Sequence, residues 1–177
     1  EELSVLDKKG AKTDHLFISD RAHLIMPYHI KLDECKEKAM GINKIGTTKR
    51  GIGPCYSDKI TRTGIRVVDL LDMEKFAEKL KNSLDEKNQL FTKLYDETPL
   101  NFDEILADYK KYAELLKHRI IDSVPEINKA LDDDKFVLIE GAQALMLDID
   151  YGTYPYVTSS SPTAGGVTVG AGVSPKK

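Results

Sequence analysis

Cysteine is scarce in this sequence, long apolar runs are absent from it, and neither sign of charge dominates it. The 177 residues include two cysteines, Cys35 and Cys55, whose separation indicates no metal site. Two thiols fit a reducing compartment better than a fold held by disulfides, so we expect a cytoplasmic protein. No apolar run approaches the ~20 residues of a membrane span, and the N-terminus does not resemble a signal peptide. We therefore expect no contact with a membrane.

The composition is that of a soluble globular domain, with 41% hydrophobic residues and a mean hydropathy of −0.37. We expect residues 1–177 to form a single α/β region, because this length is sufficient for one hydrophobic core. The net charge of −3 is small, but the charges are unevenly distributed. Residues 44–66 carry six basic residues against one acid, whereas residues 69–135 carry 17 acids and 11 bases. One basic island in an acidic chain indicates a local anion site and not a nucleic-acid-binding surface.

Helical spacing of apolar residues dominates the middle of the chain. Residues 26–40 predict an amphipathic helix, and the apolar face of that helix contains Tyr28, Leu32, Cys35 and Ala39. His29 lies off that face, so we expect it to be solvated. A similar spacing recurs over about 71–131, which predicts a helical scaffold.

Three short apolar runs predict buried strands at residues 15–19, 65–68 and 135–139. Together with the helices they indicate an α/β fold that has a few mostly parallel strands and is helical in most of its residues. The polar residues Asp20, Arg21 and His23 follow the first run. A structural ion pair or a turn explains them better than a functional site does.

Residues 45–66 contain a glycine-bearing stretch with the composition of a phosphate site. Its glycines and a proline prevent one continuous helix and allow the backbone to approach a ligand closely. Hydroxyl and cationic donors are concentrated at Thr47, Thr48, Lys49 and Arg50. The spacing is not that of a Walker A loop. If residues 57–63 are helical, Lys59 and Arg62 share a face and converge on one anion, although a solvated basic face is an equally good interpretation.

A second glycine-bearing stretch covers residues 140–172. It follows the predicted strand at 135–139, and open α/β folds bind ligands at the carboxyl ends of such strands. No charged residue lies between Asp150 and Lys176, and the stretch is rich in hydroxyls and glycines. These groups suit an anion or a nucleotide, while a glycine-rich surface loop is the alternative. The acidic triplet at 132–134 is better explained as a solvated turn than as a metal site.

Both stretches closely resemble the adenylosuccinate synthetase family. The resemblance is carried by IGTTKRGIGPCYSDKITR at 45–62, by EGAQ at 140–143 and by LDIDYGTYPYVTSS at 147–160. It extends to ISDRAH at 18–23 and RVVDL at 66–70. It implies a P-loop-like adenylosuccinate synthetase fold, of which this chain is a helix-rich central portion within a larger sheet. It also implies a GTP-dependent ligase of purine (AMP) biosynthesis that joins IMP and L-aspartate, assisted by Mg²⁺.

The resemblance also implies roles for individual residues. Thr48 and Thr158 correspond to donors to the IMP 5′-phosphate. Gln143 corresponds to an amide near the reacting oxygen of the base, which makes it both a substrate-binding and a catalytic candidate. Lys59 corresponds to a lysine associated with activity, and Arg62 to an arginine that reaches the neighbouring subunit's site in a homodimer. The main residues that bind Mg²⁺ and GTP, and the catalytic histidine, are expected outside this chain.

Three functional interpretations follow from these observations. The chain is the central part of such a ligase and active only within the longer protein, or it is a nucleotide-monophosphate binding module without catalysis, or it is a scaffold that binds nothing. The first two share one structural hypothesis. Thr48 and Thr158, which lie 110 positions apart in the sequence, must meet across a polar hollow.

Overall fold

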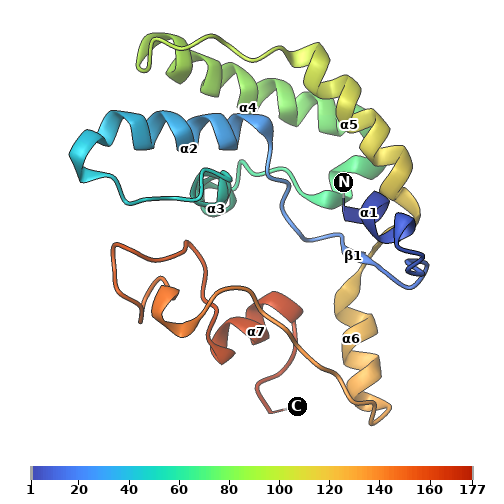
Figure 1. Cartoon of the computed structure of the whole chain (residues 1–177). Helices are drawn as coiled ribbons and strands as arrows, with labels where there is room; N and C mark the ends of the chain where they lie inside the picture. The colour runs from blue at the N-terminus through green and yellow to red at the C-terminus, as the bar shows by residue number, and fades with distance from the viewer. Residues whose placement is uncertain (1, 177) are drawn as a thin grey trace.

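The structure is a computed structural model that describes residues 2–176 (Figure 1). Helices account for most of the regular structure: α1 Glu2–Lys8, α2 Pro27–Met40, α3 Ile52–Thr61, α4 Met73–Lys93, α5 Phe102–Leu116, α6 Ser123–Asp132 and α7 Ala164–Ala171. Short 3-10 turns lie at Gly41–Asn43, Val67–Leu71, Lys117–Arg119 and Leu145–Leu147. Two strands, β1 Ile18–Ser19 and β2 Ile120–Ile121, complete the described part of the chain. The helix-rich α/β class predicted from the sequence is confirmed.

The hydrophobic core lies where α2, α4 and α5 pack together. The long helix α4 buries Phe76, Leu80, Leu84 and Phe91 along one face, as the helical spacing of these residues predicts. From α2, the core receives Tyr28, Leu32 and Cys35, whereas the fourth predicted member, Ala39, is exposed near the end of the helix. The ring of Tyr109 on α5 stacks on that of Phe76, with 5.2 Å between the ring centroids.

A polar stripe covers another face of α2. His29, Asp33 and Glu37 succeed one another at intervals of four residues and are all buried, with His29 fully so. The expectation that His29 is solvated is therefore wrong. Met26 N–H donates to His29 Nδ1 at 2.9 Å, and Nε2 lies 3.0 Å from Asp58 Oδ2 on α3. The helix α3 and the loop before it cover this stripe. These three side chains are therefore buried because polar groups of α3 and the loop bind them, and an apolar pattern could not predict their burial.

Among residues 2–176, strand pairing consists of one parallel ladder and one isolated bridge. Ile18 pairs with Ile120 and Ser19 with Ile121, which confirms the strand expected at 15–19 but in shorter form. The sequence did not predict β2, because Ile120 continues the apolar repeat of α5. The strand predicted at 65–68 is wrong. Arg66 makes an isolated antiparallel bridge with His23, and the Asp69 carboxylate then accepts from Arg66 N–H at 2.8 Å and closes a 3-10 turn.

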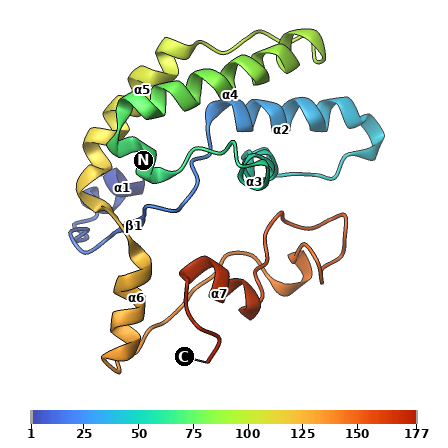
Figure 2. The same cartoon turned by 180° about the vertical axis from the view of Figure 1, so that it is seen from behind.

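The strand predicted at 135–139 is also wrong. This segment has no regular structure, and Phe136 and Leu138 are 93% and 80% exposed. A strand requires a neighbour for its backbone hydrogen bonds, and no described segment pairs with this one. After α6 the chain returns beneath α3, which places the second glycine-bearing stretch opposite the first (Figures 1 and 2).

Candidate functional site

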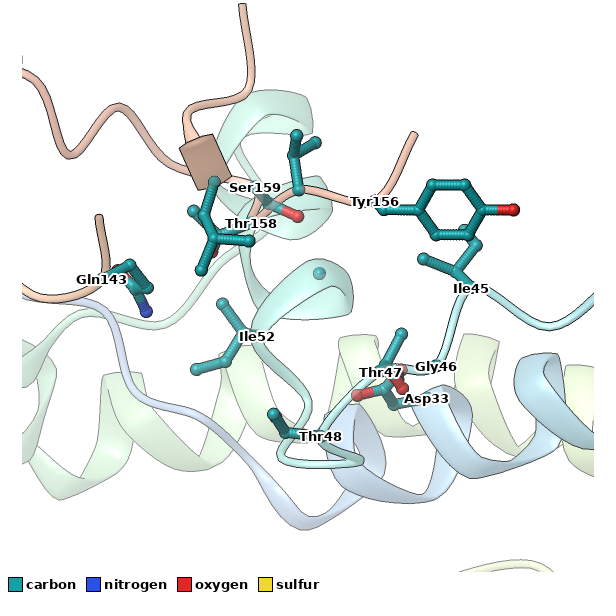
Figure 3. Close-up of a pocket in the computed structure, with 13 residues that line it drawn as sticks. Asp33, Ile45, Gly46, Thr47, Thr48, Ile52, Gln143, Tyr156, Thr158 and Ser159 are labelled. Carbon is teal, nitrogen blue, oxygen red and sulfur yellow. Dashed lines mark hydrogen bonds between the residues drawn. The ribbon is translucent and has the colours of Figure 1, made fainter. Parts of the chain in front are cut away.

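A cavity of about 340 Å³ separates the two glycine-bearing stretches. Thr48 contributes to it from the loop before α3, and Gln143 and Thr158 contribute from the returning segment (Figure 3). The structure thus brings together three of the five predicted site residues. The remaining wall is formed by Asp33, Ile45, Gly46, Thr47, Ile52, Gly53, Leu147, Tyr156, Val157 and Ser159.

The loop that carries Thr48 needs left-handed backbone at several positions. Gly46, Lys49 and Gly51 have φ angles of 82°, 55° and 74°. Gly51 also lies against α2, where a Cβ atom would come within 2.8 Å of the backbone of His29 and Ile30. Only glycine meets both conditions, so this position fixes the loop and the start of α3 on α2.

The opposite wall is held by Asp148, which is 1% exposed. Its Oδ1 atom accepts from the backbone N–H groups of Asp150 at 2.9 Å and Tyr151 at 3.1 Å. These backbone hydrogen bonds, of which that from Asp150 has the largest effect, hold the pKa of Asp148 below its ordinary value despite burial. Thr158 N–H donates to the carbonyl of Leu147 at 2.8 Å, so the folded turn directly positions Thr158 beside the cavity.

The polar groups of the two walls are available to a ligand. Thr48 and Gln143 are exposed, and their side chains make no hydrogen bond within the described residues. Thr158 is half-buried, and its hydroxyl has a single long contact of 3.5 Å with Ser160 Oγ. Hydroxyl and amide donors on facing walls can bind the oxygens of an anion from two sides.

Lys59 and Arg62 do not lie on this cavity. The helix expected over 57–63 ends at Thr61, and Arg62 follows it as the C-cap with φ 67°, so the two basic residues do not share a helical face. Lys59 faces two other cavities, of about 650 and 900 Å³, and its Nζ atom lies 5.4 Å from the centroid of the Tyr56 ring. Arg62 is exposed at the end of α3.

A buried ionic network fixes α3 beneath α2 and α4. Asp58 accepts from Lys87 Nζ at 2.9 Å on one oxygen and contacts His29 Nε2 at 3.0 Å through the other. Burial raises the pKa of Asp58, but the hydrogen bonds from His29 and Lys87 outweigh it and leave that pKa below its ordinary value. Burial lowers the pKa of Lys87, but the hydrogen bond to Asp58 outweighs burial and leaves that pKa above its ordinary value. Because Met26 N–H occupies His29 Nδ1, Nε2 is the nitrogen that donates to Asp58.

The other polar groups considered from the sequence have structural partners or lie in turns. Arg21 pairs with Asp20 at 3.1 Å and with Asp122, which confirms a structural ion pair. The acidic triplet is at the end of α6 and in the turn that follows. Among residues 2–176, no three His, Cys, Asp or Glu side chains are grouped as a metal would require. None of the described helices is both long and apolar enough to cross a membrane.

Sequence reasoning missed Asp33, Tyr156 and Ser159, which also line the cavity. Asp33 had a detectable signal, because it is the middle member of a polar stripe spaced four residues apart. A search for apolar spacing alone passes over such a stripe. Tyr156 and Ser159 lie next to Thr158 and could have been included by their proximity.

Comparison with known proteins identifies the family of the chain. A family model described as adenylosuccinate synthetase matches residues 1–177. The adenylosuccinate synthetases of Fusobacterium nucleatum and Streptococcus sanguinis are 64% and 56% identical over all 177 residues. A solved structure of fully ligated adenylosuccinate synthetase from Plasmodium falciparum superposes with a TM-score of 0.86 at 40% identity, over 98% of this chain and 42% of that one. The chain spans 42% and 41% of the lengths of the two bacterial relatives.

Proposed function

We propose, since the chain belongs to the adenylosuccinate synthetase family, that it forms the IMP-binding part of a GTP-dependent ligase that joins IMP and L-aspartate. The observation that supports this proposal is the shared cavity of Thr48, Gln143 and Thr158. Two distant segments supply its polar groups, and the buried Asp148 carboxylate holds the turn that carries Thr158. The product in this proposal is adenylosuccinate, on the route to AMP. The cytoplasmic location expected from the sequence stays a prediction.

In this proposal the two threonines bind the 5′-phosphate of IMP. Their hydroxyls donate to phosphate oxygens from opposite walls, and such charge-assisted hydrogen bonds are stronger than neutral ones. The phosphate is remote from the reacting atom, so the energy of binding it is used to position the purine. Gln143 lines the same cavity, and in this proposal its amide orients the base as both donor and acceptor.

Lys59 and Arg62 take different roles in this proposal. Arg62, exposed at the end of α3, reaches the IMP site of a second subunit in a homodimer. Lys59 contributes to activity from outside the cavity of Thr48, on the side that faces Tyr56. We therefore expect a substitution of Arg62 to weaken IMP binding in the homodimer only, whereas a substitution of Lys59 should lower activity.

GTP and Mg²⁺ are implied by the family, and GTP would supply the phosphoryl group that activates the 6-oxygen of IMP. Among residues 2–176, no three His, Cys, Asp or Glu side chains are grouped as an all-protein metal site would require. We therefore assign no Mg²⁺ ligand and no phosphoryl-transfer step to residues 2–176.

A titration of IMP into the protein in its natural length, and into residues 1–177 alone, tests the proposal. We expect Thr48→Val to weaken IMP binding by roughly tenfold or more, because the variant keeps its shape and loses one hydroxyl donor to a charged group. The matched control is Thr92→Val on the exposed surface of α4, which should bind as the unaltered protein does. Unchanged binding by Thr48→Val would contradict the proposed phosphate site.

A further inference from the structure

Two buried carboxylates on α2 face the loop that carries Thr48. Asp33 and Glu37 are 6% and 4% exposed and lie one helical turn apart. Neither forms an ion pair within the described residues, although Lys44, Lys49 and Arg50 are close in sequence to the groups that they bind. Their partners are instead hydroxyl and backbone groups of the loop.

The four carboxylate oxygens are used in four hydrogen bonds along the loop. Glu37 accepts from Ile45 N–H at 3.3 Å on Oε1 and from Gly46 N–H at 3.1 Å on Oε2. Asp33 accepts from the Thr47 hydroxyl at 3.0 Å on Oδ1 and from Gly51 N–H at 3.0 Å on Oδ2. The bonds thus enclose residues 48–50 from both sides, and Thr48 lies between the two groups that Asp33 holds.

We propose that Asp33 and Glu37 are positioning residues, which set the conformation of residues 45–51 so that Thr48 presents its hydroxyl to the cavity. The inference rests on the proposed function in naming IMP as the ligand. It does not require either carboxylate to touch the ligand. Figure 3 shows Asp33 beside Thr47 and Gly46, with Thr48 on the next part of the same loop.

The loop needs such support because it has no regular secondary structure and holds one non-glycine residue, Lys49, in left-handed backbone. Gly46, Lys49 and Gly51 all have positive φ, and the loop contains no regular backbone hydrogen bonding. The N–H group of the buried Gly51 must find an acceptor within the protein, and Asp33 on α2 provides it. A threonine in a loop without these bonds would sample many orientations, and binding a phosphate would then carry an ordering cost.

Amide substitutions distinguish positioning by hydrogen bonds from an effect of charge. An Asn at position 33 can still accept from Gly51 N–H, while its NH₂ group donates to the Thr47 hydroxyl. All of its bonds are therefore kept. A Gln at position 37 cannot do the same, because both of its partners are backbone donors and one of them would face the NH₂ group. Asp33→Asn also removes a negative charge from the wall of a cavity proposed to hold a phosphate.

The experiment uses the protein in its natural length and the variants Asp33→Asn, Asp33→Ala and Glu37→Gln. The control is Glu34→Gln, an exposed residue of the same helix. Amide hydrogen exchange at Gly46 and Gly51 without ligand reports on the loop, and the KM for IMP, measured beside kcat and the KM for GTP, reports on the site. We expect Asp33→Ala and Glu37→Gln to exchange faster and to raise the KM for IMP about tenfold, with the KM for GTP unchanged. Asp33→Asn should match the unaltered protein or bind IMP more tightly.

Each other outcome overturns the positioning role. Unchanged exchange in Asp33→Ala and Glu37→Gln would show that the carboxylates do not shape the loop. Faster exchange with an unchanged KM for IMP would show that the loop does not serve the ligand. A defect in Asp33→Asn equal to that of Asp33→Ala would show that charge matters and not the hydrogen bonds. If the unaltered protein binds no IMP, the proposed function fails, and the exchange rates alone then decide whether the carboxylates shape the loop.

Discussion

At the scale of single residues, Asp58 shows how a buried charge connects stability to the site. It holds His29 of α2 and Lys87 of α4 from the middle of α3, the helix that begins next to the cavity. A buried ion pair adds little net stability, because both charged groups lose their hydration when it forms. Removing one of the two groups is costly, because the other then remains buried without an opposite charge. The network therefore specifies where α3 packs.

We predict that Asp58→Asn lowers the free energy of unfolding by about 3 kcal/mol at neutral pH, because Lys87 then remains buried with only Glu86 as a carboxylate partner. The control is Asp85→Asn, which removes an exposed pair with Lys81 and should cost no more than about 0.5 kcal/mol. Urea denaturation of both variants measures the difference. Equal costs for the two substitutions would contradict the account.

The same residue predicts a dependence on pH. The pKa of Asp58 is lower in the native protein than its ordinary value of 3.8, so the native state holds the ionised form more tightly than the unfolded state does. Its contribution is thus complete above the ordinary pKa and is lost as the pH falls through the native one. We expect the stability gap between the unaltered protein and Asp58→Asn to be constant from about pH 5 to 8 and to shrink below about pH 4. A gap that widens on acidification would contradict this assignment.

At the scale of elements, sequence patterns predicted helices better than strands. The apolar spacing of residues 26–40 and of about 71–131 is a local signal that requires no partner segment. A strand forms only where a neighbouring segment accepts and donates its backbone hydrogen bonds. The apolar runs at 65–68 and 135–139 do not indicate whether such a segment is present. The burial of His29 was equally hidden, because it depends on Asp58 from another helix.

The contact between α2 and the start of α3 provides a test at this scale. Gly51 and Gly10 both have positive φ, near 74° and 71°, but a Cβ at Gly10 meets nothing within 4 Å. We expect Gly10→Ala to cost about 1 kcal/mol through backbone strain alone. Gly51→Ala should cost about 2–4 kcal/mol, because its methyl group also collides with the α2 backbone. Thermal unfolding of the two variants measures this difference, and equal melting temperatures would show that α3 does not pack against α2 as described.

At the scale of the whole molecule, the site forms because the chain after α6 returns to the loop before α3. The loop at 45–51 and the segment at 143–159 are separated in the chain by the helices α3, α4, α5 and α6, and both segments line the cavity. Residue chemistry predicted which side chains a phosphate would need, and the resemblance predicted which of them work together. The four-residue spacing of Asp33 and Glu37 is visible in the sequence, but the groups that they bind depend on which face of α2 the loop covers.

The central claim is that Thr48 and Thr158 together hold the phosphate end of a purine monophosphate. Its most direct measurement is the ratio of the dissociation constants of inosine and IMP, determined by calorimetry for the unaltered protein, for Thr48→Val and Thr158→Val, and for the double variant. We predict that the unaltered protein strongly prefers IMP, that each variant loses roughly tenfold of this preference while inosine binding stays unchanged, and that the two losses are coupled. Equal affinities for inosine and IMP, or a preference that survives in the double variant, would contradict the claim.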